Sequence, residues 1–571
     1  MHTADPRAFA HGTVAPDRNP RQPATVPGRR GHRWTFALAV VALLGQMAVA
    51  MVTAAVQQTP TIDEPVYVGA AAVQLREHSL RYNAEHPPLG KLIIQTGLTF
   101  TGVRPDPGFV GDQQSLGRHV LYDQGEDAAR VLFLARLPMI VLTLLFGLVV
   151  LAFAGDLTRS LDDRLSRWGG LLALALYAFS PDVIAHGSLA TLDVPAAGFV
   201  LTAAWLLWRA RERPRRYLPL AGLALGAALA TKMSSLAVVP VLLSLAVLSV
   251  WTSTGASGHR AAGRRLGLGV AAAAEVGLVA VATVWAAYLA VDPRLRWTTP
   301  DSLPAVHGLR ALVDWLPFPR PYRDGMRVQF QFEDATWGGF LFGRNYVGSR
   351  WYYLPAALLV KTPLGMLLLW AAGALAVLVR PRPRVAAPYL LVPPAVLLAA
   401  AATGSRDFGT RYVIFLPMFL AVAAAAVLAW RHRWIGAAAG VLVLLVAVSS
   451  LRAYPYYLPY SNEAFGGPAQ THRHLHDSNV DWGQDLGRLA DRLRERYPGE
   501  RIWLVYKGSG DPAYYGIEST DPRPVPPDQV HGLLVVSNSS VARADRRLAV
   551  LLDGSTPIDS VGHSITIFRR P

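Results

Sequence analysis

The sequence contains no cysteine, which excludes disulfide bridges, thiol nucleophiles, thiolate metal sites and iron–sulfur clusters. Charged residues are also scarce, at 16% of the 571 residues, whereas soluble domains usually carry about 25%. A Gly-rich phosphate loop, an HExxH motif and a hydrolase nucleophile elbow are absent too. The composition therefore argues against an ordinary water-soluble enzyme.

Lysine is rare, with only four among the 55 basic residues: Lys91, Lys232, Lys361 and Lys507. Arginine therefore serves wherever a generic positive charge is sufficient. A lysine kept in such a chain suggests that a compact ammonium with single-point contacts is needed. We expect such a functional role for Lys91, Lys232 and Lys361, with chance retention as the alternative.

Hydrophobic residues make up 52% of the chain, and they fall in runs of about twenty, long enough to cross a bilayer. The first run, 34–56, is too long for the core of a signal peptide, so we predict a retained transmembrane helix. The sequence predicts a polytopic α-helical membrane protein with about 11 transmembrane helices. The predicted spans are 34–56, 130–154, 168–186, 193–208, 217–231, 235–252, 266–291, 353–379, 387–403, 412–430 and 434–451.

Arginine placement sets the orientation, because positively charged loops stay in the cytoplasm. The arginine-rich connections all fall on the side of residues 1–33, which we predict to be a disordered basic cytoplasmic tail. The short connections on the other side hold only Lys232, Arg406 and Arg411 as basic residues. The amino terminus is therefore predicted in the cytoplasm and the carboxyl-terminal region outside the cell membrane.

Two long outer loops interrupt the predicted transmembrane domain, 34–451: loop 57–129 and loop 292–352. Loops of this length usually carry function. Residues 452–571 alternate helical and strand patterns, which predicts a small extracytoplasmic α/β domain. This tail carries 14 basic and 14 acidic residues, so the net charge of +16 lies in the membrane part and its connections. The charge therefore gives no support for nucleic-acid binding.

Two adjacent acids, Asp63 and Glu64, follow the first apolar run almost immediately. Acids close to a membrane are costly and are functional candidates. The alternative is a helix start, in which Asp63 caps the first turn and Glu64 favours the helix dipole. The residues alone do not decide between these roles.

Several cations are predicted to gather on the same outer side. Lys91 follows Glu85, His86 and two prolines, and it opposes the dipole of the helix that it begins, so an anionic partner explains it better. Its companions are Arg136, Lys232, Lys361 and Arg411. Each alone could be a side chain that reaches to the interface. Together they indicate an anionic ligand at the outer bilayer surface, such as a lipid phosphate.

Other polar patterns give weaker indications. Asp193 could cap a transmembrane helix or face a substrate. His472, His474 and His476 would align on one face of an extended strand and could bind metal, but a solvated loop is favoured. The segment from Asp477 begins like a calcium-binding loop, yet it has Trp482 in place of glycine and Arg488 in place of glutamate. We therefore predict no metal site and no cofactor.

These motifs together resemble the C-type, lipid-carrier-dependent glycosyltransferases, most closely the protein O-mannosyltransferase family (glycosyltransferase family 39). The resemblance covers roughly residues 34–490. It rests on Asp63-Glu64, His86-Pro-Pro-Leu-Gly-Lys91, Ala135-Arg136-Leu-Pro, Thr191-Leu-Asp193-Val-Pro, Ala230-Thr-Lys232, Trp351-Tyr-Tyr with Lys361-Thr-Pro-Leu, and Asp477-Ser-Asn-Val-Asp-Trp-Gly-Gln-Asp485-Leu. The sugar-binding repeat insert of eukaryotic members is absent from loop 292–352. In related lipid A aminoarabinose transferases a lysine contacts phosphate where His86 stands here, and Lys91 could substitute.

The resemblance implies an inverting transfer of a sugar, mannose or another hexose, from a polyprenyl-phosphate carrier to a hydroxyl acceptor such as protein Ser/Thr. Asp63 is then expected to be the base, with Glu64 positioning it or contacting the acceptor. Donor-phosphate contacts are expected from Arg136, Lys232, Lys91 and His86. Sugar or acceptor contacts are expected from Glu85, Asp193, Lys361 and Arg411. Fixed cations could stabilise the leaving phosphate without a metal.

Other functions remain open at this point. The acceptor could be a lipid or an envelope polymer rather than a protein. A transporter is a different class, but its paired halves with interrupted helices are not evident in the sequence. The expected partners are the lipid-linked sugar donor, the acceptor and membrane lipids, with no nucleic acid.

Overall fold

The computed structural model describes residues 31–253, 259–300, 303 and 305–571. Most of the predicted basic tail, residues 1–30, lies outside the described residues. The last three residues of that predicted tail already belong to helix α1 (Gly31–Gln57), so the helix starts earlier than residue 34.

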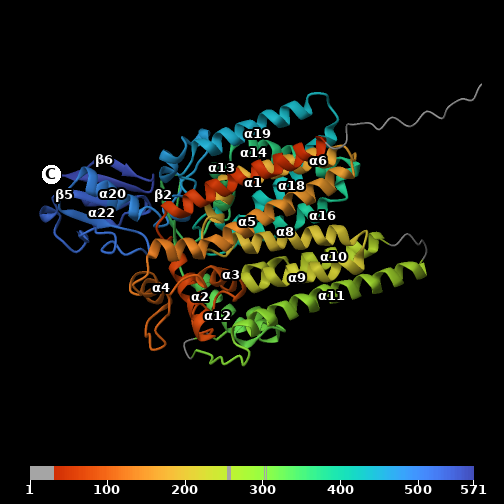
Figure 1. Ribbon diagram of the computed structural model, residues 1–571, viewed down its shortest axis with the longest axis horizontal. Helices are drawn as coiled ribbons and strands as arrows, with labels where there is room; N and C mark the ends of the chain where they lie inside the picture. Colours follow the sequence, from red (N-terminus) through yellow and green to blue (C-terminus); the bar gives the residue numbers. More distant parts are fainter. Residues whose placement is uncertain (1–30, 254–258, 301–302, 304) are drawn as a thin grey trace, which may run out of the picture.

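Every apolar run predicted to cross the membrane coincides with helical structure, and the long helices run side by side along the longest axis of the molecule (Figure 1). A helix satisfies its backbone hydrogen bonds internally, so an apolar segment can lie in a membrane in this form. After α1 the helices are α5 (Ala128–Arg159), α6 (Leu165–Ala178), α7 (Pro181–Gly187), α8 (Asp193–Ala210), α9 (Pro214–Thr231), η1 (Met233–Val238), α10 (Val239–Ser253), α11 (His259–Val291), α13 (Tyr353–Lys361), α14 (Leu364–Val379), α15 (Pro381–Arg384), α16 (Ala387–Leu390), α17 (Val392–Ala402), α18 (Phe415–Ala424), η4 (Ala425–Trp430) and α19 (Ile435–Arg452).

Among the described residues, five helices are long and apolar enough to cross a membrane by length and composition, and up to seven if each bent pair forms one span. The eleven-span count therefore stays a prediction. The single helix predicted over 353–379 is wrong, because α13 and α14 meet at 120°. Pro363 lies at the bend and disfavours helical backbone at the residue before it. A second bend, of 63°, separates α6 from α7, where Ser180 accepts a hydrogen bond from the Val183 amide.

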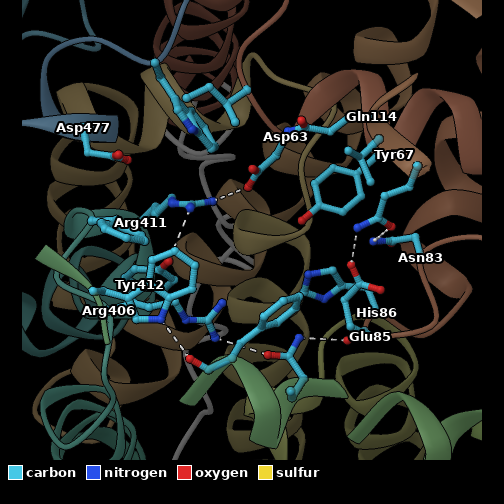
Figure 2. A pocket seen from close by; sticks show the side chains of 18 of the residues that line it. Asp63, Tyr67, Asn83, Glu85, His86, Gln114, Arg406, Arg411, Tyr412 and Asp477 are labelled. Atoms are coloured by element: carbon cyan, nitrogen blue, oxygen red, sulfur yellow. Dashed lines mark hydrogen bonds and ion pairs between the residues drawn. The ribbon is translucent and has the colours of Figure 1, made fainter. Parts of the chain in front are cut away.

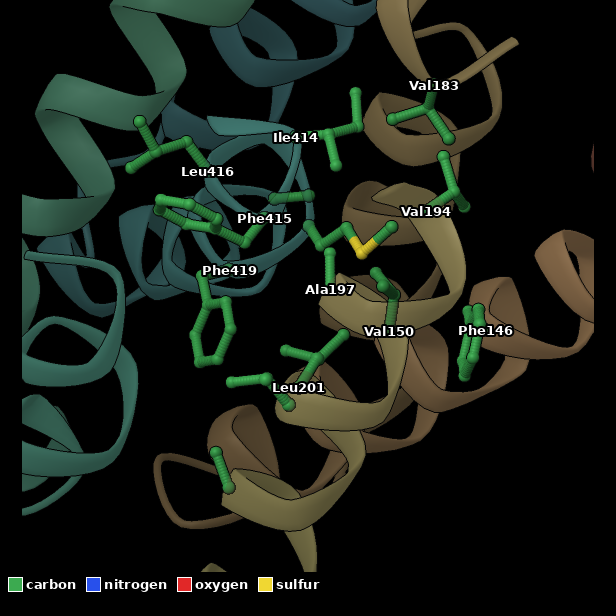
Figure 3. Close-up of a cluster of buried hydrophobic side chains, with 14 of the residues drawn as sticks. Phe146, Val150, Val183, Val194, Ala197, Leu201, Ile414, Phe415, Leu416 and Phe419 are labelled. Carbon is green, nitrogen blue, oxygen red and sulfur yellow. The ribbon is translucent and has the colours of Figure 1, made fainter. Parts of the chain in front are cut away.

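A buried apolar core holds the helices together (Figure 3). Phe146 and Val150 of α5 meet Ala197 and Leu201 of α8, and Phe419 of α18 completes this layer. Because these side chains exclude water and fill the space between helices, they fix α8 and α18 beside each other. Asp193 and Arg411, described below, lie at the start of α8 and just before α18, respectively.

The two predicted outer loops fold into short elements. Loop 57–129 contains α2 (Glu64–Glu77), α3 (Leu89–Leu98) and α4 (Gln113–Tyr122). Figure 1 places these helices and α12 at the same end of the helix bundle as the carboxyl-terminal sheet. Loop 292–352 contains η2 (Gly308–Trp315), α12 (Arg320–Asp334), β1 (Gly338–Leu341) and β2 (Arg344–Val347), and η3 (Thr410–Val413) lies before α18.

The tail contains a five-stranded sheet with the order β4-β3-β5-β7-β6. β3 runs parallel to β4 and β5, whereas β7 is antiparallel to β5 and β6. The tail elements are η5 (Glu463–Phe465), η6 (Pro468–Arg473), η7 (Asp477–Asn479), α20 (Leu486–Arg496), β3 (Ile502–Val505), β4 (Ser519–Thr520), η8 (Pro527–Gln529), β5 (Gly532–Ser537), α21 (Asn538–Ala542), α22 (Arg546–Asp553), β6 (Thr556–Val561) and β7 (Ile565–Arg570). The alternation of helical and strand patterns predicted for residues 452–571 is present in these elements.

Alternating side chains divide the sheet into two apolar faces, as a period of two requires. Leu504, Val535 and Ile567 pack with the leucines of α20 on one face. Trp503 and Leu534 pack with the leucines of α22 on the other face of the sheet. Helices therefore cover both faces.

Candidate functional site

Two cavities meet at the end of the helix bundle where α2 and α12 lie (Figure 1). The first, which we call the polar cavity, has a volume of about 520 Å³, and the second, the apolar-walled cavity, has about 570 Å³. Both are lined by Asp63, Tyr67, His86, Gln329, Arg406, Arg411 and Tyr412, which we call the junction. Figure 2 shows the polar cavity with these side chains pointing into it from different elements. A ligand in one cavity therefore reaches a ligand in the other at the junction.

Away from the junction, the polar cavity combines hydrogen-bonding and aromatic side chains. Its polar wall comes from the first outer loop, with Glu85, Gln113 and Gln114, and from Asp477 of the tail. The aromatic side chains are Phe332, Trp337, Phe408 and Trp482. Such a lining suits a polar or amphipathic ligand, because aromatic faces and hydrogen-bonding groups are both available.

The apolar-walled cavity lies among α8, η1, α12, α17 and α18. Its wall includes Ala197, Val200, Leu397 and Phe415. Lys232 lines this cavity together with other charged residues, among them Asp193, Arg310 and Glu333, and its side chain is 16% exposed. Hydrophobic walls with a cation at one end match an amphiphile that has an acidic head.

Asp63 occupies the N-cap position of α2, but in the described part of the chain its side chain makes no capping hydrogen bond. Instead, Nη1 of Arg411 lies 2.5 Å from Oδ2 of Asp63. No hydrogen bond to Oδ1 occurs among the described residues. The capping explanation of Asp63 therefore does not fit, and one carboxylate oxygen faces the junction without a partner.

The Asp63–Arg411 pair belongs to a row of alternating charges. Nη1 of Arg411 lies 4.0 Å from Oδ2 of Asp193, and Lys232 forms a short ion pair with the other oxygen of Asp193. Asp193 is the first residue of α8. Its side chain pairs with Lys232 instead of capping the helix. The row brings together four residues from four separate segments of the chain.

Glu64 and Arg136 lie outside both cavities. They form an ion pair with neither side chain exposed, and Arg136 also donates to the backbone oxygens of Ala55, Gln58 and Thr59. Burial alone would raise the pKa of the Glu64 carboxyl, but the Arg136 guanidinium more than offsets this and lowers the pKa below its usual value. These two residues pair with each other and hold the start of α2, and their expected roles toward the phosphate, the acceptor and Asp63 stay predictions.

Lys91 and Lys361 are also enclosed. The ammonium of Lys91 donates to two backbone oxygens and to the amide oxygen of Asn83, so uncharged groups take the place of the anion expected there. Lys361 donates to the backbone oxygens of Leu458 and Asn479, and it lines neither cavity. Both lysines bind backbone groups in this structure, and the expected phosphate contact of Lys91 and sugar or acceptor contact of Lys361 stay predictions.

His86 and Glu85 lie in the site as expected. Burial lowers the pKa of the His86 imidazole well below its usual value, and Lys232 and Lys91 lower it further. In the described part of the chain, Nδ1 of His86 has no hydrogen-bond partner. A neutral His86 supplies a hydrogen bond but no charge to a phosphate. The side chain of Glu85 accepts a hydrogen bond from Gln113.

The sequence prediction missed four junction residues, Tyr67, Gln329, Arg406 and Tyr412. Arg406 forms an ion pair with Glu333 at 2.9 Å. A usable signal was present, because Arg406, Arg411 and Lys232 are the basic residues of the short outer connections, and all three line the cavities. The two tyrosines carried no signal that distinguishes them from core residues.

Among the described residues, no group of three or more His, Asp or Glu side chains is placed to hold a metal ion. The extended strand on which the disfavoured metal alternative for His472, His474 and His476 depends is not formed, because η6 covers the first of them and His474 follows its end. In the calcium-like segment, Asp481 and Asp485 accept hydrogen bonds from Ser539 and Ser564, respectively.

Residues 41–291 match the family model described as dolichyl-phosphate-mannose-protein mannosyltransferase. Over these residues the chain is mannosyltransferase-like. The resemblance predicted from the motifs is confirmed for this mannosyltransferase-like region, which includes Asp63, His86, Asp193 and Lys232. The match and the long apolar helices indicate a multi-pass membrane protein and support a lipid-carrier-dependent glycosyltransferase.

No curated protein sequence matches the chain. Similar solved structures include ArnT from Cupriavidus metallidurans bound to undecaprenyl phosphate, with 14% identity and a TM-score of 0.46 over 95% of this chain and 98% of that chain. The Saccharomyces cerevisiae Pmt1-Pmt2 complex bound to the sugar donor has 17% identity and a TM-score of 0.31 over 45% and 32% of the two chains. AglB from Archaeoglobus fulgidus, an oligosaccharyltransferase in complex with an inhibitory peptide and a dolichol-phosphate, has 13% identity and a TM-score of 0.43 over 82% and 59%.

Proposed function

We propose that this chain transfers a hexosyl group from a polyprenyl-phosphate carrier to a hydroxyl acceptor at the outer face of the membrane. Mannose is the sugar and protein the acceptor that the description of the matching family favours, and Ser/Thr side chains would supply the hydroxyl. The observation that carries the proposal is the position of Asp63 at the junction of a polar and an apolar-walled cavity. The carrier occupies the apolar-walled cavity and the acceptor enters the polar one.

The reaction is a displacement with inversion. The acceptor hydroxyl oxygen forms a bond to the anomeric carbon while the bond from that carbon to the phosphate oxygen breaks. The hydroxyl proton passes to Oδ1 of Asp63, and the carrier leaves as a phosphomonoester. A base within reach of the hydroxyl contributes about 10²–10⁴-fold to the rate of such a step.

The charge that develops on the leaving phosphate needs fixed positive groups. Lys232 and Arg411 are available at the junction, although each also contacts Asp193. Because the site is partly shielded from water, cations already held in place stabilise the leaving group more strongly than they would in solution. Arg411 also keeps the Asp63 carboxylate in position by its contact to Oδ2.

Asp63→Asn tests the proposal. The substitution keeps the side-chain volume but removes the proton acceptor, so turnover with a polyprenyl-phosphate hexose should fall by about 10²–10⁴-fold. Binding of the carrier should change little, because Lys232 is intact. The assay measures hexose transfer and carrier affinity on the purified protein, with thermal unfolding alongside.

A matched control is Asp127→Asn. Asp127 caps α5, where its side chain accepts a hydrogen bond from the Ala129 amide at 3.0 Å, and asparagine can keep this cap. Activity should stay within about twofold of wild type, because a cap that is kept leaves the fold unchanged. Near-normal turnover in Asp63→Asn would eliminate Asp63 as the base. Mass spectrometry of glycoproteins and envelope glycolipids, with and without the protein, distinguishes a protein acceptor from a lipid or polymer acceptor.

A further inference from the structure

The segment 477–486, which we call the strap, belongs to the tail but reaches back to the candidate site. It begins in η7 and ends at the first residue of α20. Asp477 and Trp482 line the polar cavity. The strap therefore brings residues of the tail into contact with residues that precede them by several hundred positions.

The acids of the strap are used to fold the strap itself. Asp477 pairs with Lys507, and Asp481 accepts from the amides of Gly483 and Ser539. Gly483 has a φ of 90°, a backbone conformation that favours glycine because it has no Cβ. The strap is thus held from within the tail in one conformation.

On one side, the strap fixes the backbone that leads into Asp63. The Ile62 amide donates to the backbone oxygen of Trp482 at 2.9 Å, and the Thr59 amide donates to that of Gln484 at 3.0 Å. The hydroxyl of Thr59 adds a bond to the oxygen of Gly483. Residues 59–62 therefore follow the strap immediately before Asp63.

On the other side, the strap contacts the partner of Asp63. The guanidinium carbon of Arg411 lies 4.4 Å from the ring centre of Trp482, and the Trp482 side chain is itself 1% exposed. The amide oxygen of Asn479 accepts from the Thr410 amide, one residue before Arg411. A cation over a buried indole face is attracted strongly because little water competes.

We propose that Trp482 is a positioning residue that aligns the Asp63–Arg411 pair, through its backbone oxygen on the Asp63 side and its indole ring on the Arg411 side. This inference rests on the proposed function, in which Asp63 is the base and Arg411 stabilises the phosphate. The tail then supplies part of the site's geometry instead of only covering it.

Trp482→Leu and Trp482→Phe test this role. Loss of the ring face should lower kcat by about 10- to 30-fold, the size of a desolvated cation–π contact, with little change in acceptor KM. Phenylalanine keeps a π face and should restore kcat to within about threefold of wild type. The control is Trp503→Leu, since Trp503 is equally buried and lies 4.1 Å from the Arg501 guanidinium, but lines neither cavity.

The inference is overturned if Trp482→Leu keeps wild-type kcat, if phenylalanine fails to rescue, or if Trp503→Leu lowers kcat equally. A double-mutant cycle in thermal unfolding, combining Trp482→Leu with Arg411→Met, provides a measurement that needs no turnover. Coupling in this pair, and none between Trp503 and Arg411, supports the contact even if the wild-type protein transfers no hexose. Absence of coupling overturns the inference, whereas absence of wild-type transfer alone overturns only the proposed function.

Discussion

Arg136 and Glu64 are joined by two parallel hydrogen bonds, 2.7 Å from Nε to Oε1 and 2.6 Å from Nη2 to Oε2, and no part of either side chain is exposed. Oε1 of Glu64 also accepts from the Ala190 amide, and Oε2 accepts from Thr61. The pair therefore connects α5, the start of α2 and the segment before α8. Its place beside Asp63 makes it a structural support of the site.

Arg136→Met should unfold the protein more easily, because it leaves the Glu64 carboxylate buried without a partner. The expected loss is about 3–5 kcal/mol in the free energy of unfolding. Equilibrium unfolding in detergent measures it. Arg159→Met, in the same helix but with a side chain 56% exposed, should cost less than about 1 kcal/mol. A stable Arg136→Met protein with weakened carrier binding would instead restore the direct phosphate contact expected from the sequence.

Lys232→Met should weaken binding of a polyprenyl phosphate by about 10- to 100-fold, since a hydrogen bond to a charged group contributes roughly 1.5–3 kcal/mol. Titration of the purified protein with the carrier measures the effect. Arg523→Met is the control, because Arg523 lines neither cavity and forms an ion pair with Asp521 away from the site. Equal carrier affinity in Lys232→Met and wild type would remove Lys232 from the phosphate site.

Acidification should destabilise the tail through His476. Burial lowers the pKa of this imidazole to about 4, with the charges of Asp477, Lys507 and Arg543 nearby. The folded pKa lies below the unfolded value of 6.5, so the stabilising contribution is present above pH 6.5 and is lost as the pH falls toward 4.

His476→Phe should remove this dependence, since the ring stands against Phe340 and Phe408 and an apolar ring fits there. The difference in unfolding free energy between wild type and variant should change by up to about 1.4 kcal/mol per pH unit in this window. Thermal unfolding at pH 7, 6, 5 and 4.5 measures it. If the unfolding stabilities of wild type and His476→Phe change in parallel with pH, His476 is not the group responsible.

Reporter fusions test the orientation predicted from the arginines. A reporter after Pro571 should be active outside the cytoplasm, and one inserted after Arg213 should be active inside, because arginine-rich connections stay in the cytoplasm. A carboxyl-terminal reporter that is active only in the cytoplasm would contradict the eleven-span count and the outer location of the site.

The helices could be predicted because long apolar runs leave the backbone one way to satisfy its hydrogen bonds in a membrane. The break between α13 and α14 could have been expected from Pro363, but its 120° angle depends on packing against other helices. Strand β6 could not be predicted in the same way, because its side chains are mostly exposed and show little apolar alternation.

The composition of the site was partly predictable, whereas its pairing was not. Asp63, His86, Asp193, Lys232 and Arg411 were identified as single charged or polar residues, and all of them line the cavities. Which cation meets which acid depends on contacts between segments that lie far apart in the sequence. Arg136 and Lys232 therefore could not be told apart in the sequence, although the Arg136 side chain is fully buried and the Lys232 side chain lines a cavity.

The two cavities share only the junction, so the remaining walls can change separately. A bulkier side chain at Ala197 or Leu397 would alter the fit of the lipid chain without touching the acceptor wall. Changes at Gln114 or Trp337 would alter the acceptor fit without touching the lipid wall. Under the proposed function, carrier preference and acceptor preference are therefore independently adjustable properties of this scaffold.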